Sequence, residues 1–221
     1  MKIIKILNDN QLTKIKELLV QLEFQDGKKT ASGLSRDVKS NSEATPNSKA
    51  YKELQEFMTK ILMKNVFLKR RFFPRLFSNP LINIYKKGDS YGRHYDNSYM
   101  DTRNGPIRKD FSFTIMLSEP NEYEGGALKI EKENITQEVK LGAGEMAIYP
   151  SNNIHSVLPI LKGERVAYVG WMSSCIKDPL SLEVLNAFED MYIELQKYDL
   201  SEDDTLMVNF FQNKLRHLLS D

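Results

Sequence analysis

The stretch EMAIYPSNNIHSVLPILKGERVAYVGWM, residues 145 to 172, decides the fold class of this chain. It contains three runs that are apolar, β-branched or aromatic, separated by short polar segments: EMAIY (145–149), IHSVLPI (154–160) and RVAYVGWM (165–172). Short runs of this kind, bounded by Gly, Pro, Asn and Ser, are typical of antiparallel strands. The stretch therefore predicts consecutive strands of a β domain.

The same pattern continues towards the N-terminus of this stretch. Four further runs have strand character: LINIY (81–85), FSFTIML (111–117), ALKIE (127–131) and QEVKL (137–141). So many short strands with turn residues between them are expected of a jelly roll. We predict a double-stranded β-helix, a cupin-like core, over about residues 76–175.

Helical periodicity flanks the predicted β core on both sides. Apolar residues recur every three or four positions in four segments: 10–23, which follows Asn10 as a plausible N-cap, 48–65, 180–197 and 203–219. We therefore expect a mainly β fold with flanking α-helices. The polar segment 26–47 between the first two helices is expected to be an extended surface segment, with a functional lid and a disordered loop as the alternatives.

The length of 221 residues suits one main domain with helical additions. We expect this domain to span residues 1–178, with a helical N-terminal part over 1–75. Residues 179–221 are expected to form a helical extension that packs on the core or on a second subunit. No sequence repeat indicates another domain.

Composition narrows the possible partners and location. The 31 Lys and Arg residues nearly balance 30 Asp and Glu residues, for a net charge of +1, so no global field favours nucleic acid or an anionic membrane. The N-terminus lacks a secretory h-region, and no apolar run approaches the roughly 18 residues of a membrane span. The single cysteine, Cys175, fits a reducing compartment. We expect a cytoplasmic protein without nucleic-acid or membrane partners.

Two of the three histidines lie in the β region and suggest a metal site. His94 and Asp96 are two residues apart, so in extended backbone their side chains point to the same face. His155 lies on a later predicted strand that the fold can bring alongside. Two imidazoles and one carboxylate form the facial triad of non-haem iron oxygenases, which leaves positions open for substrates.

Each part of this triad has a simpler interpretation. A His-x-Asp sequence taken alone usually marks a surface pair, and His155 could be a core or rim histidine that is hydrogen-bonded to a neighbour. His217, in the last predicted helix, is interpreted in that simpler way. The combination of the three residues is what indicates metal.

Arg165 follows His155 by ten residues and opens the strand RVAYVGWM, whose alternation places it on one face with Val169 and Trp171. A guanidinium on an apolar face needs a partner, and the distal carboxylate of 2-oxoglutarate fits its fork. The alternative is a strand-end arginine that reaches solvent. Tyr85 could give the same carboxylate a second hydrogen bond, or be an ordinary half-buried tyrosine.

The chain resembles the small bacterial PKHD-type (prolyl/lysyl-hydroxylase-type) Fe(II)/2-oxoglutarate dioxygenases, some of which are associated with iron and siderophore uptake. The resemblance runs nearly end to end through four blocks: GKKTASGLSRDVKSN (27–41), PRLFSNPLINIYKKGDSYGRHYDNSYM (74–100), RKDFSFTIMLSEPNEYEGGALKI (108–130) and LGAGEMAIYPSNNIHSVLPILKGERVAYVGWMSS (141–174).

The resemblance implies an enzyme with iron ligands at His94, Asp96 and His155 and a 2-oxoglutarate-binding Arg165. It implies Fe(II), 2-oxoglutarate and O₂ as cofactor and co-substrates, with ascorbate as reductant. The expected reaction couples decarboxylation of 2-oxoglutarate to succinate and CO₂ with hydroxylation of a substrate. That substrate would be an amino-acid side chain, a peptide or a small molecule such as a siderophore, which would place the enzyme in iron homeostasis.

Two other interpretations compete with this one: a non-catalytic iron or 2-oxoglutarate sensor, and a cupin-like metal-binding module. A homodimer is a further expectation. The segment RDVKSN (36–41) and the turn 97–108, with Arg103 and Arg108, are candidate substrate-facing loops, although both could equally be solvated.

Overall fold

A computed structural model describes residues 1–102 and 105–220, so the candidate Arg103 lies outside the described residues. The chain divides into two compact units. The first comprises residues 1–61 and 77–173, and the second comprises residues 62–76 and 174–221. The first unit contains nearly all of the strands, whereas the second is mainly helical.

The N-terminal part supplies three helices and several short strands: β1 (Lys2–Lys5), α1 (Asp9–Leu19), β2 (Phe24–Asp26), the 3₁₀ helix η1 (Gly27–Thr30), α2 (Gly33–Asp37), β3 (Lys39–Ser40), β4 (Ser42–Ala44) and α3 (Lys49–Lys64). The remaining strands of the first unit are β6 (Leu81–Lys86), β7 (Ser90–His94), β8 (Tyr99–Thr102), β9 (Gly105–Arg108), β10 (Phe111–Met116), β11 (Tyr123–Gly125), β12 (Leu128–Lys132), β13 (Ile135–Val139), β14 (Glu145–Pro150), β15 (Ile154–Val157) and β16 (Ile160–Ser174).

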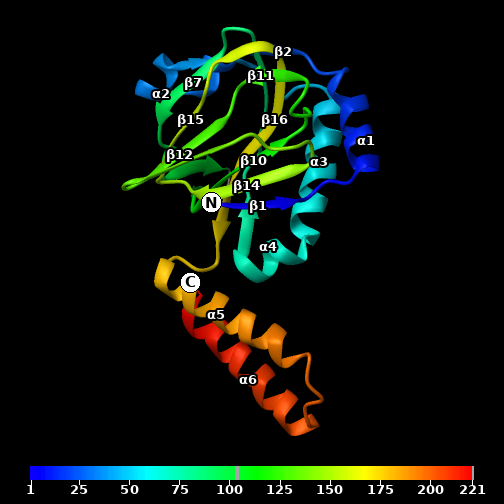
Figure 1. Ribbon diagram of the computed structural model, residues 1–221, viewed down its shortest axis with the longest axis vertical. Helices are drawn as coiled ribbons and strands as arrows, with labels where there is room; N and C mark the ends of the chain where they lie inside the picture. Colours follow the sequence, from blue (N-terminus) through cyan, green and yellow to red (C-terminus); the bar gives the residue numbers. More distant parts are fainter. Residues whose placement is uncertain (103–104, 221) are drawn as a thin grey trace. The chain divides into compact units, whose positions relative to one another are not determined.

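These strands form two antiparallel sheets and a separate hairpin (Figure 1). The large sheet has the order β1-β14-β10-β16-β6-β4-β2, and the small sheet has the order β13-β12-β15-β7-β3. Strands β8 and β9 pair only with each other within the described part of the chain. The mainly β fold with flanking helices is therefore confirmed, and each sequence-predicted run from LINIY onwards overlaps at least one strand.

The crossover between sheets corrects one prediction. The run IHSVLPI was expected to be one strand, but β15 ends at Val157 in the small sheet and β16 begins at Ile160 in the large sheet. Pro159 lies at the break. Since proline has no backbone N–H to donate to a ladder, it suits this change of sheet.

The sequence predicted an extended surface segment over residues 26–47, but the structure shows that this segment is not simply extended. It contains η1, α2, β3 and β4, and the side chains of Lys39, Asn41 and Glu43 are buried. Strand β3 joins the small sheet beside β7, and β4 joins the large sheet beside β6. Its polar composition reflects buried hydrogen bonding as well as surface exposure.

Helices α1 and α3 lie side by side in Figure 1, and an ion pair of 3.3 Å joins Lys14 to Glu53 between them. Helix α1 begins earlier than predicted, because the N-cap is Asn8 and not Asn10. The Asn8 side chain accepts a hydrogen bond from the Gln11 backbone, and the Gln11 side chain accepts one from the Asn8 backbone. This reciprocal capping box fixes the start of the helix.

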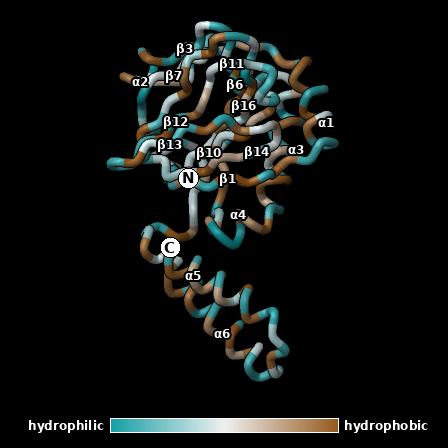
Figure 2. The backbone as a smooth tube through the Cα atoms, viewed as in Figure 1, coloured by the Kyte–Doolittle hydropathy of each residue, from teal (hydrophilic) through white to brown (hydrophobic). Residues whose placement is uncertain are grey.

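The second unit contains α4 (Val66–Arg71), β5 (Pro74–Phe77), α5 (Pro179–Leu195) and α6 (Glu202–Leu219). The buried carboxylate of Glu189 accepts hydrogen bonds from Gln212 and Arg216, which joins α5 to α6. Both helices also expose apolar side chains, and Figure 2 shows hydrophobic residues along their length. None of the helices in the described part of the chain is long and apolar enough to cross a membrane.

Candidate iron and co-substrate site

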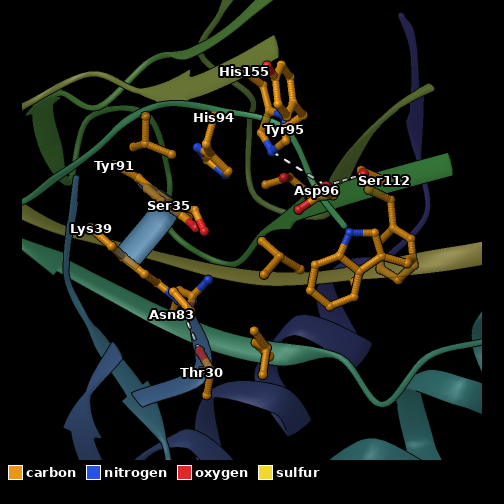
Figure 3. Close-up of a pocket in the computed structure, with 18 of the residues that line it drawn as sticks. Thr30, Ser35, Lys39, Asn83, Tyr91, His94, Tyr95, Asp96, Ser112 and His155 are labelled. Atoms are coloured by element: carbon orange, nitrogen blue, oxygen red, sulfur yellow. Dashed lines mark hydrogen bonds and ion pairs between the residues drawn. The ribbon is translucent and has the colours of Figure 1, made fainter. Parts of the chain in front are cut away.

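The three predicted metal ligands come together between two neighbouring strands of the small sheet. His94 ends β7 and pairs in register with His155 on β15, while Asp96 follows β7 by two residues. The nitrogen and oxygen atoms that they offer lie within 4.8 Å of one another. Figure 3 shows the three side chains converging from these strands.

Hydrogen bonds orient all three side chains. The Nδ1 atoms of His94 and His155 lie 2.8 Å from the Gly92 carbonyl and 3.0 Å from the Asn153 carbonyl. Since a carbonyl only accepts, each Nδ1 carries the proton and each Nε2 keeps its lone pair. This donor set fits a divalent iron ion.

Asp96 is fixed from the large sheet. The Ser112 hydroxyl on β10 donates to Asp96 Oδ2 over 2.5 Å and lies 3.0 Å from the Ser151 hydroxyl. Asp96 Oδ2 is 3.6 Å from His155 Nε2. The serine thus leaves the carboxylate facing the histidines, as Figure 3 shows.

Burial sets the charge state of His94. Desolvation and, second, the repulsion of His155 lower the pKa of His94 to about 4, so its imidazole is neutral near pH 7. Tyr91 stacks on the His94 ring at 3.6 Å between centroids, and burial raises the pKa of Tyr91 to about 12. Tyr91 therefore lines the pocket beside His94.

Arg165 lines the same pocket from the large sheet. Its side chain is only 2 % exposed, and its Nε makes no hydrogen bond within the described part of the protein. It pairs in register with Tyr85, whose ring centroid is 5.2 Å from the Arg165 guanidinium carbon. Burial lowers the pKa of Arg165 and raises that of Tyr85. A buried cation with an unpaired donor fits the carboxylate of a co-substrate.

Several lining residues were not identified from the sequence. Strand alternation places Ser112 and Thr114 of β10 in the pocket together with Tyr149 of β14. The signal was available, because Ser112 and Thr114 are the polar residues at alternate positions of an otherwise apolar strand. Burial raises the pKa of Tyr149 well above its ordinary value, so its phenol stays protonated.

The candidate loop RDVKSN contributes one wall of the pocket through Lys39. The Lys39 ammonium contacts the buried Glu43 carboxylate and lies 3.1 Å from the Thr30 hydroxyl. It also lies 5.3 Å from the centre of the Tyr91 ring. Arg108, in the other candidate loop, donates to Asp110 over 2.6 Å.

Comparison with known proteins yields a consistent set of relatives. Residues 80–173 match the 2OG-Fe(II) oxygenase superfamily. The chain is 38 % identical over 180 residues to a PKHD-type hydroxylase of Hyphomonas neptunium, covering 81 % of this chain and 80 % of that protein. It is 32 % identical over 213 residues to the PKHD-type hydroxylase YbiX of Escherichia coli, covering 96 % and 95 %.

Solved structures share the fold at lower identity. A prolyl hydroxylase from Trichoplax adhaerens, in complex with a hypoxia inducible factor peptide fragment, aligns with a TM-score of 0.60 at 17 % identity, covering 84 % of this chain and 85 % of that one. A Pseudomonas putida prolyl-4-hydroxylase aligns with a TM-score of 0.51 at 18 % identity, covering 78 % and 91 %. At these identities the likeness supports the jelly-roll fold alone.

Proposed function

The chain belongs to the PKHD-type hydroxylases of the 2OG-Fe(II) oxygenase superfamily, and from that membership we propose how its own residues carry the reaction. It is an Fe(II)- and 2-oxoglutarate-dependent hydroxylase. We assign iron binding to His94, Asp96 and His155, and 2-oxoglutarate binding to Arg165. The observation that carries these assignments is a single pocket lined by the His-Asp-His cluster and by a buried arginine.

Iron bound at this cluster supplies the chemistry by which O₂ oxidises 2-oxoglutarate to succinate and CO₂ and hydroxylates the second substrate. The protein contributes ligand orientation. Backbone carbonyls hold both imidazoles with Nε2 free, and Ser112 holds Asp96 towards them. The low pKa of His94 means that no proton must leave its ring before it binds metal near pH 7.

Arg165 binds the distal carboxylate of 2-oxoglutarate, and the Tyr85 hydroxyl adds a second hydrogen bond. Because both side chains are buried, the ion pair with the carboxylate forms at low dielectric, where it is strong. The raised pKa of Tyr85 keeps its phenol protonated and therefore able to donate. These roles explain why the Arg165 guanidinium is buried near the start of β16.

Turnover of 2-oxoglutarate tests the proposal. Purified protein with Fe(II), ascorbate and O₂ should release succinate, and Asp96→Ala should lose this activity together with most metal affinity. Asp199→Ala, which removes an exposed carboxylate between α5 and α6, is the matched control and should behave as the wild type. Tight iron and 2-oxoglutarate binding without succinate across a substrate screen would favour a sensor instead.

We further propose a small molecule or a peptide as the hydroxylated substrate, ascorbate as the reductant that maintains Fe(II), and a cytoplasmic location, where ferrous iron persists. A role in iron homeostasis stays a prediction from the family resemblance. A homodimer also stays a prediction, which the exposed apolar side chains of α5 and α6 make worth testing by sedimentation equilibrium. A monomer at micromolar concentration would contradict it.

A further inference from the structure

The charged side chains that line the pocket leave one cation without a role in the proposed reaction. They are Lys39, Asp96, Lys109 and Arg165. Lys39 is neutralised by its contact with Glu43, and Arg165 is assigned to 2-oxoglutarate. The Lys109 ammonium has no ion pair or hydrogen bond with any residue in the described ranges 1–102 and 105–220, although a half-buried ammonium is costly to leave without one.

Lys109 is positioned by the backbone beside the metal ligands. Its N–H donates to the Ser98 carbonyl over 2.9 Å, which ties it to the chain just beyond Asp96. Its ammonium lies 3.8 Å from the centre of the Trp171 ring. Trp171 pairs in register with Ser112, whose hydroxyl holds Asp96. Lys109 and Trp171 therefore form a wall of the pocket close to the Asp96 ligand, which we call the Lys109–Trp171 wall.

Charge balance indicates what this wall binds. In the loaded site, the two positive charges of Fe(II) would be matched by Asp96 and by one carboxylate of 2-oxoglutarate, and Arg165 would be matched by the distal carboxylate of 2-oxoglutarate. An imidazole that binds metal through its lone pair adds no charge, so His94 and His155 do not enter this balance. One positive charge remains at Lys109. A single carboxylate neutralises this charge. A phosphate dianion would leave an excess negative charge, and a neutral group would leave the positive charge uncompensated.

We propose that the Lys109–Trp171 wall is the substrate subsite, and that it binds a carboxylate group of the molecule that is hydroxylated. The proposal rests on the assigned iron and 2-oxoglutarate sites and names the substrate class: an acid, such as an amino acid or a peptide with an accessible carboxylate. The ammonium would form a charge-assisted hydrogen bond with the carboxylate, and the indole face would contact the adjoining apolar part.

The chain supplies its own reporter, because Trp171 is its only tryptophan. We would saturate the protein with Zn(II) and 2-oxoglutarate, which permits no turnover, and titrate N-acetylglycine while recording tryptophan fluorescence. The expected result is a saturable change that N-acetylglycinamide, the neutral amide, does not produce. Burial lowers the pKa of Lys109, so the N-acetylglycine response should fade at a pH below that of an ordinary lysine.

Lys109→Gln should raise the apparent Kd for N-acetylglycine at least about tenfold. Lys14→Gln is the matched control, since Lys14 also lies over an aromatic ring, Phe57 at 4.8 Å, but does not line the pocket. Thermal denaturation of both variants would show that they are folded. An unchanged Kd in Lys109→Gln, or equal binding of the amide, would overturn the subsite.

Two further outcomes separate this proposal from the assigned function. If the Kd for N-acetylglycine rises in proportion to added 2-oxoglutarate, the probe occupies the Arg165 site, and the subsite is overturned while the co-substrate site stands. If calorimetry shows no 2-oxoglutarate binding at all, the assigned function is contradicted, independently of the subsite. Lys109-dependent binding of the acid would then still support the anion subsite itself.

Discussion

The proposed co-substrate site depends on the buried guanidinium of Arg165. Arg165→Ala should weaken 2-oxoglutarate binding by about a hundredfold, since a buried charge-assisted pair is lost, and leave Zn(II) affinity unchanged. Isothermal titration calorimetry of each ligand would measure both. Arg93→Ala is the control, because Arg93 forms its ion pair with Glu131 on the small sheet, whereas Arg165 lies on the large sheet. Full 2-oxoglutarate affinity in Arg165→Ala would contradict the assignment.

In the proposed metal site, Ser112 acts through Asp96, to which its hydroxyl donates a hydrogen bond. Removing its hydroxyl with Ser112→Ala should lower metal affinity by about ten- to a hundredfold, because the carboxylate loses the hydrogen bond that orients it. A competitive chelator titration would measure this loss. Ser40→Ala removes another serine that donates to an aspartate, Asp89, at 2.6 Å, and should leave metal affinity unchanged. Equal effects of the two substitutions would show that the Ser112 effect is not specific.

His94 makes the stability of the metal-free protein depend on pH. Its pKa is lowered from 6.5 to about 4 in the folded state, so between these values the unfolded chain binds a proton that the folded chain does not. As far as His94 is concerned, the free energy of unfolding is therefore highest above pH 6.5. It falls as the pH drops towards 4, by up to about 1.4 kcal/mol per pH unit. Urea unfolding at pH 8, 6 and 5 would measure it. His94→Gln should flatten this slope, and an unchanged slope would refute the contribution.

At the scale of elements, the glycine pair at the end of β11, Gly125 and Gly126, shapes the wall around Arg165. Gly126 has φ +66°, and a Cβ there would lie 2.4 Å from Ile160 Cδ1 and 3.1 Å from Arg165 Cδ. Gly126→Ala should lower stability by more than the roughly 1–2 kcal/mol of left-handed strain and also weaken 2-oxoglutarate binding.

Gly88→Ala separates strain from crowding in that experiment. Gly88 also has positive φ, +93°, but a Cβ there would meet nothing within 4 Å. This control should lose only the strain energy in denaturant unfolding and keep its 2-oxoglutarate affinity. If both variants bind 2-oxoglutarate as the wild type does, Gly126 does not position Arg165. The ladder between β11 and β16 is irregular between Glu124 and Gly125, next to this glycine pair.

The elements that the sequence predicted well are those whose pattern is local. Polar and aromatic residues alternate at the start of FSFTIML, and apolar residues recur at helical spacing over residues 203–219, so both patterns are visible in a single window of sequence. Strands β2, β3 and β4 are two or three residues long, and their partners are β4, β7 and β6. No local window contains those partners, so a polar segment with strands this short was interpreted as a loop.

The residues of the candidate site also divide into those that a local sequence pattern indicates and those that depend on the fold. His94, Asp96, His155 and Arg165 could be predicted because their residue types are rare on strands and their spacing is characteristic. Lys39 could not, because its burial depends on Glu43 and Thr30, which only the folded segment brings together. Its polar sequence alone is also typical of a solvated loop.

At the scale of the whole molecule, both sheets contribute residues to the proposed iron and 2-oxoglutarate site. The two histidines come from β7 and β15 of the small sheet, and Arg165 comes from β16 of the large sheet. Ligands at about a hundred times their Kd should each add about 2.7 kcal/mol of stability. Zn(II) with 2-oxoglutarate should therefore raise the thermal midpoint by about 10 °C or more. Differential scanning fluorimetry would measure the shift.

Arg165→Ala serves as the control in that measurement, because it should keep the Zn(II) part of the shift and lose the part due to 2-oxoglutarate. A full shift in the variant would mean that 2-oxoglutarate binds elsewhere. The domain prediction of residues 1–178 followed by 179–221 remains untested as a functional division. The compact units instead group residues 62–76 with the C-terminal helices, a long-range association that the sequence does not display.

The pairing of β1 with β14 has a consequence for biosynthesis. Lys2–Lys5 is made long before its partner Glu145–Pro150, which follows more than a hundred residues later. At roughly 5–20 residues per second, β1 waits on the order of ten seconds for that strand. His155 follows β14 in the chain, so the proposed ligand cluster is complete only after this wait. We therefore expect iron to be acquired after β14 has been synthesised.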